Sequence, residues 1–284
     1  MQQPTNEADL RDAIFRAFHW EVSPCTVVLA EALPIVLNPE AKPEAAEAVL
    51  GKDPVVVAML LQQANSPLFA LTGQVKTLRQ AIVLLGWQRL RDLCLTTLLR
   101  EWVHQKRKGA RQQSWLAHSV ATGILAETLR EQARLEWPEA YITGLVHDIG
   151  RLALMELVEE DPGGPVHPCW GAPSPELAQE RENFGIDHCE AGAALLQRWG
   201  LPASIVQGTK HHHDLGLAPM PAGLTLLQLA CALASMLGYA ATEREAPLFD
   251  DIRVRFLDAT GRELGLNLAE LEAQVRERMH RPSA

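Results

Sequence analysis

The chain has 284 residues, of which 47% are hydrophobic and 21% charged, and its formal net charge is −9. This composition predicts a globular protein with a sizeable core and excludes an intrinsically disordered chain. The acidic balance argues against direct nucleic-acid binding, because a sequence-independent binder needs a basic face that neutralises phosphates.

The start of the chain lacks a basic segment followed by apolar residues, so it predicts no signal peptide. No run is expected to approach the roughly 18 uncharged apolar residues of a membrane span. The cysteines are odd in number and form no CxxC pair, which favours reduced thiols over a disulfide framework or a zinc ribbon. They are Cys25, Cys94, Cys169, Cys189 and Cys231. We therefore expect a cytoplasmic protein.

Leu, Ala, Glu, Gln and Arg dominate the chain and alternating apolar and polar runs are scarce, so an all-α fold is predicted. Pro43 and Gly51 bracket a first short helix, with proline at its start and glycine just past its end. Asp53 is then expected to cap a second helix that Pro54 opens.

A longer helix is predicted to begin near residue 78, because Thr77 and Gln80 have the spacing of a capping box. The polar, basic segment 104–109 ends in glycine, and we interpret it as a solvated connector between two helical lobes. The expected parts are an N-terminal extension, an N-terminal lobe, a second lobe and a C-terminal segment that packs on the second lobe, over residues 1–20, 21–110, 111–245 and 246–284.

In the second lobe, His118 is predicted on the apolar face of a helix, together with Leu125. Pro138 is expected to open another helix, which carries His147 and Asp148. Residues 161–175 are rich in glycine and proline and predict a long irregular loop.

Beyond this loop, Asp187 has the spacing of a cap for a helix whose inward stripe includes His188. Pro202 is expected to open the next helix, in which His212 shares a face with Thr209. An apolar helix over about 222–238 predicts a buried element. The C-terminal segment is expected to combine a short strand or extended piece over 252–256 with a final amphipathic helix.

Polar residues on four of these helices are expected to converge in the interior, where unpartnered ionisable groups are costly. They are His118, His147, Asp148, His188, His212 and His213. Imidazole and carboxylate groups are the ligands of divalent Mn, Fe or Zn. A histidine on an apolar face is more often a core residue that hydrogen-bonds the backbone, so a metal site and a hydrogen-bonded polar core both stay open.

The string Gly144–Arg151 resembles the HD motif of the HD phosphohydrolase superfamily, and His118 stands where that superfamily has its first histidine. Further stretches resemble the HDOD family in order and spacing, and the likeness covers about residues 20 to 240. These stretches are Lys52–Pro54, Ala64–Phe69, Ala81–Gly86, Phe184–Gly192, Trp199–Pro202 and His212-His213.

The resemblance implies a fully helical fold in which an N-terminal bundle packs on an HD-like bundle. It also implies a bacterial regulatory module that docks signalling proteins and binds a nucleotide or another anionic ligand. HDOD members are generally regarded as non-enzymatic, so the resemblance does not imply catalysis. Relatives with a GYP extension hydrolyse cyclic di-GMP at a two-metal centre. Their ligands would correspond to the six residues above together with a late aspartate.

The sequence departs from that hydrolase pattern in three places. Cys231 stands at the position of the late aspartate, and Arg151 replaces the lysine after the HD motif. Arginine retains a cation able to bind phosphate. No GYP element follows His213. We therefore predict a non-catalytic signalling module that holds a divalent metal or an anion, with a metal-dependent phosphohydrolase and a scaffold with an empty pocket as the alternatives.

Overall fold

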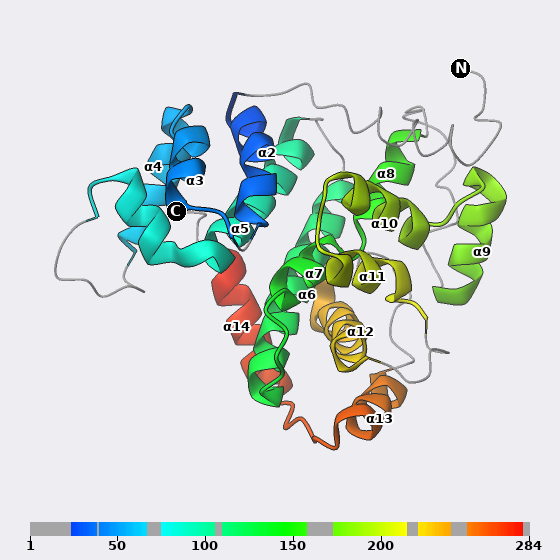
Figure 1. Cartoon of the computed structure of the whole chain (residues 1–284). Coiled ribbons are helices and arrows are strands. Elements are labelled where there is room, and N and C mark those ends of the chain that lie inside the picture. Colours follow the sequence, from blue (N-terminus) through cyan, green and yellow to red (C-terminus); the bar gives the residue numbers. More distant parts are fainter. Residues whose placement is uncertain are drawn as a thin grey trace. The chain divides into compact units, whose positions relative to one another are not determined.

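The structure is a computed structural model that describes residues 24–38, 40–66, 75–105, 110–157, 173–214, 221–239 and 249–280. All regular structure in these ranges is helical and none of it is strand, which confirms the all-α prediction (Figure 1). The chain divides into two compact units. Described residues within 24–105 and 277–280 belong to one, and those within 110–276 to the other.

The first unit is built around its longest helix. Its helices are α2 (Pro24–Val36), α3 (Pro43–Leu50), α4 (Pro54–Ala64) and α5 (Leu78–Gln105). The three shorter helices all pack against α5 and bury apolar residues such as Leu29, Leu50 and Leu60. Gly86 interrupts α5 with a φ of 71°, a backbone conformation that glycine adopts without strain.

Helix starts in this unit follow the predicted caps. The Asp53 carboxylate accepts hydrogen bonds from the backbone N–H groups of Val55 and Val56, at 2.7 and 3.0 Å. Thr77 Oγ1 accepts from the N–H of Gln80, and Gln80 Oε1 accepts from the N–H of Thr77, both at 3.2 Å. Both interactions satisfy backbone donors that have no partner within the helix.

The second unit carries the predicted polar residues. Its helices are α6 (Ala110–Ala133), α7 (Ala140–Val146), α8 (Ile149–Leu157), α9 (Pro173–Phe184), α10 (His188–Arg198), α11 (Ala203–His211), α12 (Ala222–Ala234), the π-helical turn η3 (Ser235–Tyr239) and α13 (Phe249–Thr260). The last helix, α14 (Leu268–His280), follows α13. α6 packs against α7 and α12, and α10 packs against α8 and α11.

Glycines let the helices of this unit approach closely. A Cβ atom on Gly144 would lie 2.7 Å from the Cα of Gly123 on α6. A Cβ on Gly150 would lie 1.9 Å from the backbone oxygen of His188. The turn between α7 and α8 is therefore held against α6 on one side and α10 on the other.

The strand or extended piece expected over 252–256 was wrong, because these residues lie within α13. Ile252 and Phe256 are buried four residues apart, whereas Arg253 and Val254 between them are exposed. This is the spacing of one helical face, and α13 packs that region of the chain against α12. The five-residue pattern fits both structures, and packing on a neighbouring helix decides for the helix.

The placement of His147 and Asp148 within a helix was also wrong. α7 ends at Val146 and α8 begins at Ile149, so both residues lie in the turn between the two helices. The indole nitrogen of Trp115 on α6 donates to the backbone oxygen of Asp148 at 3.1 Å and fixes this turn.

The expectation that no run reaches the length of a membrane span was wrong as well. Among the described residues, the helical stretch Ala222–Tyr239 is long and apolar enough to cross a membrane by length and composition. Half of it is buried inside the protein, and α12 packs against α6, α7 and α13. A core helix has the same composition.

Several predictions concern residues outside the described ranges. They include the N-terminal extension 1–20, residues 106–109 of the connector, Cys169 and residues 161–172 of the expected loop. Residues 173–175 of that loop prediction lie in the described part and begin α9.

Candidate metal centre

The structure brings the six predicted residues into one interior cluster of the second unit. They are His118 on α6, His147 and Asp148 in the turn before α8, His188 at the start of α10, and His212 and His213 at the end of α11. Neighbouring imidazole rings have centroids between 4.2 and 5.3 Å apart. Five of the six residues are buried, and His213 is half-buried.

Hydrogen bonds from Nδ1 orient four of the five imidazoles. For three of them the partner of Nδ1 is a backbone oxygen: Tyr239 for His118 at 2.8 Å, Gly144 for His147 at 2.7 Å and Thr209 for His212 at 2.7 Å. For His188 the partner of Nδ1 is a side-chain atom, Oε2 of Glu180, at 2.6 Å. A backbone carbonyl oxygen only accepts, so Nδ1 of His118, His147 and His212 must carry the hydrogen. In a neutral ring this leaves Nε2 with a free lone pair.

Several of the Nε2 atoms lack a hydrogen-bond partner. Those of His147, His188 and His213 are buried and make no hydrogen bond among the described residues. A buried polar atom that loses its partner costs about 1–3 kcal/mol. Metal ions could satisfy them, since His188 and His213 fall in one group of potential ligands and His147 falls in others. The Nδ1–H bonds to oxygen are the outer-shell pattern that orients metal-binding histidines.

Asp148 links two of the imidazoles. Its Oδ1 lies 3.1 Å from Nε2 of His212 and 3.3 Å from Nε2 of His188. Burial disfavours the charged carboxylate, but Arg151 and the imidazoles outweigh burial and hold the pKa of Asp148 well below its ordinary value. Burial also opposes a charge on His212, yet Cys189 and Asp148 raise its pKa well above the ordinary value. In the metal-free protein, Asp148 is therefore ionised and His212 protonated, and the two form a buried ion pair.

His147, His188 and His213 stay neutral. Burial lowers the pKa of His147, His188 and His213 well below the ordinary value. The positive charge of His212 lowers the pKa of all three further. The positive charge of Arg151 also lowers the pKa of His188 and His213. Neutral imidazole is the form that binds metals, so these three side chains are available as ligands.

Arg151, which the sequence predicts as a phosphate ligand, is buried between two carboxylates. Its Nε donates to Asp148 Oδ2 at 2.8 Å, and its Nη1 lies 3.9 Å from Glu180 Oε1. The side chain is 1% exposed. The guanidinium therefore neutralises acidic groups inside the cluster.

Glu180 and Cys189 also belong to the cluster, and neither was predicted from the sequence as a site residue. Burial raises the pKa of Glu180 to about 7, and burial also raises the pKa of the Cys189 thiol. Glu180 lies on α9, a helix whose polar composition suggests a solvated surface, so no sequence pattern indicates its burial. Cys189 follows His188 directly, and that adjacency was an available signal.

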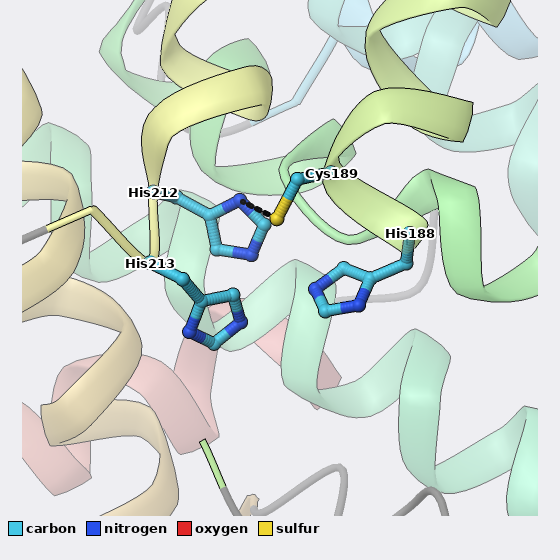
Figure 2. Close-up of side chains that lie close together, drawn as sticks. All are labelled: His188, Cys189, His212 and His213. Carbon is cyan, nitrogen blue, oxygen red and sulfur yellow. Dashed lines mark hydrogen bonds between the residues drawn. The ribbon is translucent and has the colours of Figure 1, made fainter. Parts of the chain in front are cut away.

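Three groups of side chains in this region could each hold a metal ion. They are His188 with Cys189, His212 and His213; His118 with His147 and Cys231; and His147 with Asp148 and His212. Figure 2 shows the first group, in which the rings and the thiol converge from two helices. In the second group, Cys231 Sγ lies 3.6 Å from Nε2 of His118. The cluster can therefore supply imidazole, thiol and carboxylate ligands together.

Comparison with known families decides the identity of this arrangement. Residues 23–215 match the family model of the HDOD domain. The chain belongs to the HDOD family. An uncharacterized protein of Treponema pallidum (strain Nichols) is 26% identical over 204 residues, which are 67% of this HDOD chain and 37% of that protein. The chain thus spans little more than a third of the length of this curated relative.

Solved structures share the HDOD fold. An HDOD domain protein of unknown function from Geobacter sulfurreducens has a TM-score of 0.62 at 19% identity, with 96% of each chain covered. A candidate phosphohydrolase from Shewanella amazonensis SB2B has a TM-score of 0.59 at 23% identity, with 94% of each chain covered. A candidate signal transduction protein from Marinobacter aquaeolei VT8 has a TM-score of 0.61 at 21% identity, with 98% of this chain and 64% of that chain covered.

Proposed function

We propose that this HDOD protein is a non-hydrolytic signalling module whose interior pocket holds a divalent transition metal. The observation that carries the proposal is the orientation of the histidines. In four of the five, Nδ1 is hydrogen-bonded to an oxygen atom, and buried Nε2 atoms of His147, His188 and His213 have no hydrogen-bond partner among the described residues. Such a set is costly without an ion and well arranged with one.

The residues that would hold the metal come from four separate elements. They are His118, His147, Asp148, His188, His212 and His213. Bound metal would supply positive charge and ligand bonds that link α6 to the turn before α8 in one group and α10 to α11 in another. In a regulatory module, such a cross-link would fix the relative positions of these elements.

Two features argue against hydrolysis. A two-metal hydrolase needs open positions for water and substrate, and it needs enough negative ligands to hold both ions. Cys231 stands where a carboxylate is expected, and the Arg151 cation faces Asp148 and Glu180 in the interior. We therefore assign Arg151 to charge balance and no longer place an anionic ligand on it.

A metal-dependent phosphohydrolase is the second candidate function. The group of His147, Asp148 and His212 favours it, since two imidazoles and a carboxylate are a common ligand set of catalytic zinc. The similarity to a candidate phosphohydrolase of Shewanella amazonensis agrees with this alternative.

We propose signalling proteins of the cytoplasm as the partners. The fold is shared with a candidate signal transduction protein of Marinobacter aquaeolei, and this chain covers 64% of that longer chain. Partner docking would then be the output that the metal-bound pocket stabilises.

Elemental analysis tests the metal pocket. The full chain, purified without chelator and incubated with Zn, Mn or Fe salts, is expected to retain metal after gel filtration. His147→Ala should lose it, whereas His211→Ala should keep it, because His211 is adjacent in sequence to the cluster but 30% exposed and bound to Gln207. Absence of metal in the unmodified chain would leave a hydrogen-bonded polar core.

A turnover assay separates the two candidate functions. The metal-loaded chain is expected to cleave generic phosphodiesters and cyclic dinucleotides at the background rate. Turnover that Asp148→Ala abolishes would contradict the proposal and favour the hydrolase.

A further inference from the structure

Cys189 lies inside a group of three imidazoles. One ligand atom from each of His188, Cys189, His212 and His213 lies within 4.8 Å of those of the other three (Figure 2). His188 and Cys189 are the first residues of α10, and His212 and His213 follow the last residue of α11. The two helices pack against each other, so four donor atoms meet from two adjoining helix ends.

The start of α10 holds Cys189 in place. Asp187 caps the helix by accepting from the N–H of Glu190 at 2.8 Å, and Glu180 accepts from the N–H of His188 at 2.8 Å. The Cys189 side chain is 4% exposed, and its Sγ lies 3.8 Å from Nδ1 of His212. The thiol therefore faces the cluster and not the solvent.

Within this group of four side chains, some nitrogen lone pairs face no hydrogen-bond donor. Nε2 of His188 is buried and makes no hydrogen bond, although Asp148 Oδ1 lies 3.3 Å away. Nε2 of His213 is also buried without a hydrogen-bond partner. A thiol is a weak donor, and Cys189 lies beside His212. A single cation placed among the four side chains would satisfy the unpartnered nitrogens and the sulfur at once.

We propose that Cys189 is a thiolate ligand and that it forms, with His188, His212 and His213, a four-ligand site for zinc or ferrous iron. This inference rests on the metal pocket of the proposed function and names its chemistry. Thiolate and imidazole together select borderline and soft ions over Mn and Mg. Binding forms metal–sulfur and metal–nitrogen bonds, and it releases to solvent both the thiol proton of Cys189 and the Nε2 proton that His212 directs at Asp148.

The ligand count also bears on reactivity. Zinc sites with four protein ligands are closed and structural, whereas catalytic zinc keeps one position for water or substrate. A site that Cys189 completes has no such position. A thiolate in the fourth position would thus keep this ion from activating water.

Cobalt substitution of the full chain reads out the sulfur ligand directly. With Co²⁺ in place of the native ion, we expect a thiolate-to-cobalt charge-transfer band in the near ultraviolet. Cys189→Ser should abolish this band, whereas Cys94→Ser should leave it unchanged, since Cys94 is a buried thiol of the other unit. Circular dichroism of each variant verifies that the helical fold is retained.

X-ray absorption of the zinc-loaded unmodified chain provides a test that needs no variant. One sulfur scatterer per zinc is expected, at a distance of about 2.3 Å, beside nitrogen scatterers at about 2.0 Å. Bound metal with nitrogen and oxygen neighbours alone, or cobalt bound without the charge-transfer band, would overturn the role of Cys189 and leave the metal pocket standing.

The remaining outcomes are also decisive. A band that survives Cys189→Ser but disappears in Cys231→Ser would overturn the proposal, because the thiolate would then belong to the group around His118. If no cobalt or zinc binds, the proposed metal pocket and the thiolate ligand both fail.

Discussion

Asp148 Oδ1 and His212 Nε2 lie 3.1 Å apart, although 64 residues separate them in the chain. Nδ1 of His212 is already bound to the backbone oxygen of Thr209. A carboxylate oxygen therefore faces an imidazole nitrogen across a gap that a proton bridges and that a metal ion could bridge instead. This competition between proton and metal determines how the site responds to pH.

Acid should destabilise the metal-free protein. His147, His188 and His213 have pKa values well below 6.5 when folded, so below that pH the unfolded chain binds protons that the folded chain refuses. The contribution of these three histidines to the free energy of unfolding is complete above pH 6.5. It is lost as pH falls, by up to about 1.4 kcal/mol per pH unit for each histidine. Glu180, with a pKa of about 7, takes up a proton on folding in this window and offsets one of the three.

His212 does not alter this dependence of the free energy of unfolding on pH. Its raised pKa keeps it protonated in both the folded and the unfolded state below pH 6.5. The stability that His212 contributes is lost only as pH rises through its folded pKa. Urea unfolding in the presence of chelator, at several pH values between 5 and 7, measures the slope. His213→Gln should flatten it and His211→Ala should not. Stability that is constant or rises towards acid would contradict the assigned pKa shifts.

Glu180 should act as a positioning residue for His188. Its Oε2 accepts from both the side-chain Nδ1–H and the backbone N–H of His188. Outer-shell partners of this kind are worth about 10–100-fold in metal affinity. Glu180→Ala should weaken zinc by that factor in a chelator competition, and Glu180→Gln, which retains an acceptor, by less. Glu182→Ala, an exposed change on the same helix, is the control; equal losses in both would remove the role of Glu180.

Arg151→Met should destabilise the fold. The guanidinium is the cation between Asp148 and Glu180, and its removal leaves buried carboxylates uncompensated. Breaking a buried pair in this way costs about 3–5 kcal/mol. Adding Glu180→Gln to Arg151→Met should recover part of the loss in thermal unfolding. An unchanged stability of Arg151→Met, or protection of the unmodified chain by inorganic phosphate, would return Arg151 to the role of an anion ligand.

Gly150→Ala should disrupt the site without removing a ligand. The new Cβ would meet the backbone of His188 at 1.9 Å and that of Gly192 at 2.6 Å, so α8 and α10 must separate. Such overpacking costs about 1–3 kcal/mol and moves Asp148 away from His188. Metal retention and thermal unfolding should both decline. Gly265→Ala, at a position where a Cβ meets nothing within 4 Å, should change neither.

The sequence was sufficient for the fold class, because caps such as Asp53 and Asp187 have fixed spacings and apolar stripes have a helical period. The same stripes identified residues that the fold brings together. Glu180 could not be found in this way. Its burial depends on which helix packs over it, and a polar helix such as α9 carries no stripe that reveals this. The error over 252–256 has a similar origin, since Ile252 and Phe256 suit a helix as well as a strand.

The groups that accept hydrogen bonds from the histidines differ in how far a substitution can remove them. Tyr239, Gly144 and Thr209 hold His118, His147 and His212 through backbone oxygens, whereas Glu180 holds His188 with its side chain. A substitution at Tyr239 or Thr209 leaves the accepting backbone oxygen in place. Gly144 must in addition remain glycine, because a Cβ there would lie 2.7 Å from the Cα of Gly123. Insertions or deletions near η3 would be more damaging than point changes there. The orientation of three of the histidines thus depends on the course of the backbone. Only the orientation of His188 depends on an acceptor that belongs to a side chain, that of Glu180.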